Sequence, residues 1–163
     1  MNADAPAVLQ ALEASGFGAA IRQSLWIYPF ANVGHVIAVI VFAGAVAIMD
    51  VRLMGGLAAT DPAQVLRSAR LVAVAAFVAI AITGSLLFTA EASHVALNPV
   101  FQTKVLLIGL ALLNVLAFEL LFGRSLARTP ARMPLPAAAR ASAFVSLATW
   151  IAVAACGRSI AYF

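Results

Sequence analysis

Apolar residues fill four stretches of this chain, and polar residues gather between them. The stretches are residues 25–49, 71–90, 105–122 and 141–163. Each holds about 18 residues or more, the length at which an α-helix crosses a hydrocarbon core of roughly 30 Å. The pattern predicts an all-α integral membrane protein, a four-helix bundle in which residues 1–163 form a single four-span transmembrane domain.

The segment before the first stretch carries a weaker apolar pattern. Asp4 and Pro6 form a helix-start signature. No basic region precedes the apolar residues and Glu13 is acidic, so we do not expect a signal peptide. We expect a short N-terminal interfacial helix that lies on the membrane. Its intermittent apolar face consists of Val8, Leu9, Leu12, Phe17 and Ile21.

Composition supports a lipid environment. The chain is 64% hydrophobic and only 10% charged, whereas a soluble domain carries roughly 25% charged residues. The net charge of +4 does not indicate nucleic acid binding, because the arginines lie beside the apolar stretches rather than on one basic face. Cys156 is the single cysteine, so no intramolecular disulfide can form, and we interpret it as a small buried apolar residue.

The basic residues also predict how the bundle is oriented. Two loops, 50–70 and 123–140, together hold seven of the ten basic residues, against three on the other side. Cytoplasmic loops carry the excess of Lys and Arg, so we expect these loops in the cytoplasm and both termini outside. The seven are Arg52, Arg67, Arg70, Arg124, Arg128, Arg132 and Arg140; the three are Arg22, Lys104 and Arg158.

The candidate chemistry centres on a histidine inside the first stretch. His35 lies nine residues after Trp26, about 13 Å along a helix, at a depth where an ionisable group is costly. A neutral imidazole there can bind a metal. Lys104 and Arg158 fall in the same outer layer and would supply positive charge for haem propionates or a quinone headgroup. We therefore expect haem b with His35 as axial ligand, and Asn32, one turn earlier, to orient it.

Plainer interpretations compete with this one. His35 could form a hydrogen bond to a neighbouring helix, and Lys104 and Arg158 could extend to the headgroups. His94 falls in a loop, where we expect it to be exposed; with two histidines in all, a pair of bis-histidine haems is excluded.

Other polar residues inside the apolar stretches have structural interpretations. We expect Asn114 to bond between helices, Glu119 to pair with Arg70 or Arg124, and Trp150 to pack within the bundle. No nucleophile motif or P-loop is present, and the catalytic residues, if any, are unknown.

Three segments resemble a bacterial family of small four-span membrane proteins of unknown function. They are NVGHVIAVIVFAGAVAIMDVRLMG (32–55), NPVFQTKVLLIGLALLNVLAFEL (98–120) and WIAVAACGRSIAYF (150–163). More distantly, the layout is similar to the HemJ-type protoporphyrinogen oxidases and to CopD-like haem-binding membrane proteins. The matching positions are His35, Gly44, Arg52-Leu53 and the Phe101–Lys104 element. The resemblance implies haem b held by His35, an important Lys104, and the bacterial inner membrane with periplasmic termini.

These observations favour an electron-transfer role, with a quinone or a redox protein as partner. Porphyrinogen oxidation of the HemJ type is the alternative, but Asp50-Val51-Arg52-Leu53 replaces the Pro-Arg-Leu-Phe element of that group. A cofactor-free accessory or scaffold subunit of a membrane complex is a third interpretation. Nothing in the pattern chooses between a homo-oligomer and a subunit of a larger complex.

Overall fold

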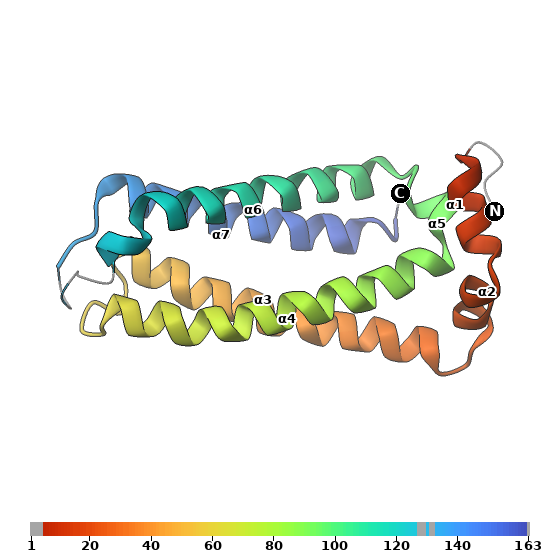
Figure 1. Ribbon diagram of the computed structural model, residues 1–163, viewed down its shortest axis with the longest axis horizontal. Helices are drawn as coiled ribbons and strands as arrows, with labels where there is room; N and C mark the ends of the chain where they lie inside the picture. Colours follow the sequence, from red (N-terminus) through yellow and green to blue (C-terminus); the bar gives the residue numbers. More distant parts are fainter. Residues whose placement is uncertain (1–4, 127–129, 131–132, 163) are drawn as a thin grey trace.

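The computed structural model describes residues 5–126, 130 and 133–162, and those residues form helices joined by short connections. Four long helices dominate it, and three short helices lie at one end (Figure 1). The long helices are α3 (Ile27–Met54), α4 (Pro62–Ala90), α6 (Pro99–Leu126) and α7 (Ala137–Ser159), and the short ones are α1 (Ala7–Ala14), α2 (Gly16–Gln23) and α5 (Ala92–Val95).

The four long helices confirm the predicted membrane protein. All four are long and apolar enough to cross a bilayer. Each begins or ends beyond its apolar stretch; α4 starts nine residues before residue 71, because the Asp61 side chain accepts the Ala63 N–H and Pro62 occupies the first turn. Residues Thr60-Asp61-Pro62, a sequence typical of helix starts, thus mark the start of the second long helix.

The bundle consists of two helix pairs whose main contact with each other is between α3 and α7. Helix α3 packs on α4, α6 packs on α7, and α3 also packs on α7. Both termini lie at the same end of the bundle, and the loops after α3 and α6 lie at the opposite end (Figure 1). We call these the terminal end and the loop end. The spatial grouping of the basic loops is therefore the one that their sequence predicted.

Two apolar clusters fill the interior. One lies toward the loop end and includes Leu53, Leu66 and Phe118. The other lies nearer the middle, where Phe42 on α3 packs with small alanines and with Trp150 on α7. Trp150 meets the Phe42 ring edge-on at 4.6 Å between ring centres, which confirms its predicted packing role.

Hydrogen bonds and one ion pair join the helices where polar side chains enter the spans. Asn114 and Ser142 exchange two hydrogen bonds between α6 and α7, of 3.0 and 2.9 Å, so the predicted interhelical role of Asn114 is confirmed. Arg70 on α4 pairs with Glu119 on α6 at 2.7 Å, which identifies Arg70 as the partner of that carboxylate. Asp50 is 5% exposed, and its Oδ2 has no hydrogen-bond partner among the described residues.

The N-terminal segment forms two short helices where the sequence predicted one. Ser15 separates them and caps α2 by accepting the Gly18 N–H. Both helices stand across the terminal end of the bundle (Figure 1). Glu13 is 6% exposed, and its side chain accepts hydrogen bonds from the Ser93 N–H and hydroxyl of α5. Arg22 donates to the Ala90 carbonyl at 2.7 Å, so polar contacts secure this cap.

The Glu13 contact predicts acid sensitivity of the cap. Hydrogen bonding from the Ser93 hydroxyl lowers the pKa of Glu13 below its ordinary value of 4.5. Its contribution to stability is therefore fully present above about pH 4.5 and is lost as the pH falls through the lower folded pKa. We expect Glu13→Gln to loosen the cap by about 1–3 kcal/mol at neutral pH and to flatten this dependence.

Hydrogen exchange of the α1 and α5 amides between pH 3 and 7 would measure this effect, at roughly the range where carboxyl groups titrate. Glu91→Gln is the matched control, because Glu91 is an exposed carboxylate beside the same short helix. An unaltered pH profile in Glu13→Gln would assign the acid response to another group.

Candidate functional site

His35 lies half-buried on α3, with its ring turned toward α4. Its Nδ1 is 2.9 Å from the Thr83 hydroxyl oxygen. That hydroxyl donates its only hydrogen to the Ala79 carbonyl at 2.6 Å, so it accepts a hydrogen bond from His35. The tautomer that this arrangement favours has its proton on Nδ1 and its lone pair on Nε2. Such fixing of one ring nitrogen is typical of histidines that bind a metal through the other.

One glycine leaves room beside the His35 ring, and a second leaves room beside Lys104. A Cβ atom on Gly84 of α4 would stand 3.2 Å from the Cε1 atom of His35, closer than such contacts normally are. A Cβ atom on Gly157 of α7 would stand 3.3 Å from the ammonium nitrogen of Lys104. Larger side chains at these two positions would crowd the groups that carry the candidate chemistry.

Lys104 brings a positive charge to the same layer. It is half-buried on α6, close enough to His35 and to Cys156 for electrostatic interaction. No carboxylate among the described residues pairs with it. All four long helices therefore contribute residues here: α3 supplies His35, α4 supplies Thr83 and Gly84, α6 supplies Lys104, and α7 supplies Gly157. We call these five residues the His35 layer.

Aromatic side chains bound the His35 layer on both sides. Phe88 on α4 stacks on Phe101 of α6 at 5.5 Å, about one turn nearer the terminal end. Toward the loop end the boundary is a cluster of three rings, each seven residues, about 10 Å, from the layer on its own helix. Those rings are Phe42, Phe77 and Trp150.

The other predicted site residues do not meet at His35. Asn32 is exposed, and the His35 ring is oriented by Thr83 instead. Arg158 is also exposed; it bonds to the Tyr162 hydroxyl and lies over that ring at 4.7 Å. His94 is exposed on the single turn of α5, as expected for a histidine outside the spans. Lys104 is thus the predicted cation that joins His35.

Sequence reasoning missed Thr83 and Gly157. A threonine in an apolar helix ordinarily bonds to its own backbone, as Thr83 also does, and nothing in its spacing points to His35. Gly84 lies beside the same imidazole ring on α4. Its contact with the His35 ring depends on how α3 and α4 face each other, which the apolar pattern of these helices does not specify.

The donor set limits what this layer can hold. Among the described residues, no group of three or more His, Cys, Asp and Glu side chains is placed to hold a metal ion. A bare ion with several protein ligands therefore does not fit. The donor requirement of haem is met, because haem brings four equatorial nitrogens and needs a single protein imidazole.

Comparison with known proteins places the chain in a family. The model of the Family of unknown function (DUF6644) matches residues 13–163. The chain belongs to this family. No curated protein matches it, and no solved structure matches it.

The family match runs from the buried Glu13 of α1 through all four long helices. It therefore includes the N-terminal cap from Glu13 onward as well as the His35 layer. The predicted membership in an uncharacterised family is confirmed, whereas the more distant resemblance to HemJ-type and CopD-like proteins stays a prediction.

Proposed function

We propose that this protein binds haem b within the membrane and serves in electron transfer, with His35 as the protein axial ligand. The observation that carries the proposal is the hydrogen bond to Thr83, which leaves Nε2 of His35 with a free lone pair inside the bundle. Haem bound there would supply a one-electron redox centre.

The other residues of the His35 layer support this assignment through their charge and size. Lys104 has no carboxylate partner among the described residues, so its ammonium group is free to face a propionate. Gly84 and Gly157 keep side chains away from the imidazole and the ammonium. The aromatic rings on either side give the layer apolar surroundings, and such surroundings favour the neutral imidazole that a metal requires.

The first test is an absorption spectrum of the purified protein, oxidised and reduced, after expression with ample haem. We expect a Soret band in the wild type. Lys104→Ala should retain the band but lose haem faster or shift its potential, because it alters charge and not coordination. Arg158→Ala should change less, since Arg158 is exposed and engaged by Tyr162. A wild-type protein with no Soret absorbance would leave the cofactor-free accessory subunit as the function.

A HemJ-like oxidation of porphyrinogen on the same haem is the second candidate. The specific observation in its favour is that His35 and Lys104, both carried by that resemblance, lie within electrostatic reach of each other. Rescue of a bacterial strain that lacks its porphyrinogen oxidase would favour this activity over electron transfer. A quinone or a redox protein is the partner that we propose for the electron-transfer role.

The orientation that we propose places both termini in the periplasm of a bacterial inner membrane. Among the basic residues that the structure describes, five lie toward the loop end and three toward the terminal end, which favours a cytoplasmic loop end. We expect a C-terminal alkaline phosphatase fusion to be active and a C-terminal fluorescent protein fusion to be dark. The reverse pattern would place His35 in the cytoplasmic leaflet while leaving the four spans unchanged.

A further inference from the structure

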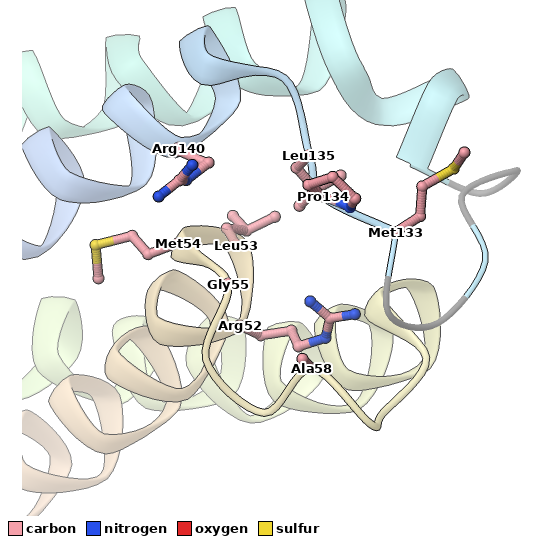
Figure 2. A pocket seen from close by; sticks show the side chains of 9 residues that line it. All are labelled: Arg52, Leu53, Met54, Gly55, Ala58, Met133, Pro134, Leu135 and Arg140. Atoms are coloured by element: carbon pink, nitrogen blue, oxygen red, sulfur yellow. The ribbon is translucent and has the colours of Figure 1, made fainter.

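A pocket of about 280 Å³ opens at the loop end of the bundle, far from the His35 layer. It lies between the end of α3 with its following loop and the segment that leads into α7 (Figure 2). Two arginines line it among mostly apolar neighbours. The lining residues are Arg52, Leu53, Met54, Gly55, Ala58, Met133, Pro134, Leu135 and Arg140.

Arg52 is a buried cation, only 2% exposed. No carboxylate among the described residues forms an ion pair with it. Nε and Nη2 both donate to the Thr60 carbonyl, at 3.2 and 2.8 Å. Nη1 makes no hydrogen bond within the described part of the chain. Burying a guanidinium with a single neutral acceptor is costly, so an anion at the pocket would satisfy both its charge and its remaining donors.

Two helix ends of opposite dipole sign adjoin the pocket, the C-terminus of α3 and the N-terminus of α7, and of these only the N-terminus of α7 favours an anion. The carbonyls of Val51 and Arg52 at the end of α3 are occupied by the N–H groups of Gly56 and Gly55. Gly55 adopts a φ of +107°, a left-handed conformation that only glycine reaches without strain, and this ends α3 beside the pocket. Helix α7 begins at Ala137 with no side-chain cap, so the positive end of its dipole is open near Arg140.

We propose that this pocket binds a phosphate group, carried either by an anionic phospholipid headgroup or by a soluble phosphate ester. Arg52 and Arg140 both line the pocket and supply its positive charge, Arg52 from the end of α3 and Arg140 from the first turns of α7 (Figure 2). Leu53, Met54 and Leu135 provide an apolar surface for the glycerol and first methylene groups of a lipid. Basic pockets between spans on the cytoplasmic side are typical sites for acidic headgroups, and this end of the bundle is the more basic one.

The test measures lipid binding to the purified protein in detergent by native mass spectrometry. Phosphatidylglycerol and phosphatidylcholine are titrated separately, and inorganic phosphate and glycerol phosphate are then added as soluble competitors. Arg140→Gln removes an exposed lining charge, and Arg67→Gln removes an equally exposed charge at the same end that does not line the pocket. Ala58→Glu places a carboxylate beside Arg52 without removing its bonds to Thr60, and Ala59→Glu is its matched control.

We expect wild-type protein to bind phosphatidylglycerol at least about tenfold more tightly than phosphatidylcholine. Arg140→Gln and Ala58→Glu should each weaken this binding by about tenfold, while the two controls stay within about twofold. Competition by the soluble phosphates would identify a phosphate ester as the natural ligand, and its absence would identify the lipid. Equal retention of the two lipids, or equal losses in Arg140→Gln and Arg67→Gln, would overturn the proposal.

Discussion

Replacing His35 with alanine is expected to abolish haem binding, while replacing His94 leaves the Soret band intact. His35 is half-buried in α3, and its Nδ1 is held by Thr83, so Nε2 is presented as a ligand. No other histidine among the described residues lies inside a span. His94 is exposed on α5, where water satisfies its ring. Haem content per protein, measured by pyridine haemochrome and by the Soret band, reports the outcome directly.

Thr83→Val tests whether the hydrogen bond that orients His35 matters for haem binding, while the proposed ligand His35 itself stays in place. It removes the hydroxyl that accepts from Nδ1 and keeps the shape of the side chain. We expect haem affinity to fall by about 10- to 100-fold with the Soret band still formed, as in other losses of a supporting hydrogen bond. Loss of the band in His94→Ala alone would mean that α5 carries the ligand, and His35 would then be an interhelical hydrogen-bonding residue.

Gly84→Leu is expected to have the second largest effect, because it acts on the packing of α4 against His35. A Cβ atom alone would stand 3.2 Å from Cε1 of the imidazole, and the remaining leucine atoms would displace the ring. We expect a destabilisation of about 1–3 kcal/mol, typical of an overpacked contact, together with loss of haem. Thermal unfolding in detergent, followed by circular dichroism, measures the first effect, and the Soret band measures the second.

Gly44→Leu is the matched control for this substitution. Gly44 is exposed on α3, and a Cβ atom there would meet nothing within 4 Å. Both variants gain the same helix propensity, because glycine is about 0.8–1 kcal/mol less favourable than alanine in a helix and leucine ranks close to alanine. The difference between the two variants therefore isolates the contact with His35. Equal midpoints for the two variants would show that the ring moves aside freely, and full haem content in Gly84→Leu would place the cofactor away from α4.

The polar contacts between the spans show which interaction partners the sequence predicts and which it does not. Glu119 was expected to pair with Arg70 or Arg124, and the structure selects Arg70 across the two helix pairs. Asn114 was expected to bond to another helix, and the structure names Ser142. In both cases the cost of an unpaired polar group in lipid predicts that a partner exists. The rotation of each helix about its axis then decides which residue that partner is.

The sequence by itself determined the four spans, the grouping of basic loops at one end and the presence of an ionisable group deep in the first span. Length and hydropathy set the first of these, because backbone hydrogen bonds must be satisfied inside the helix in lipid. Tertiary structure alone decided that Lys104 rather than Arg158 joins His35, that Thr83 orients the ring, and that Arg52 is enclosed in a pocket. The physical reason is that spans apolar on every side carry almost no periodic signal for their buried face, so helix rotation is set by packing between helices.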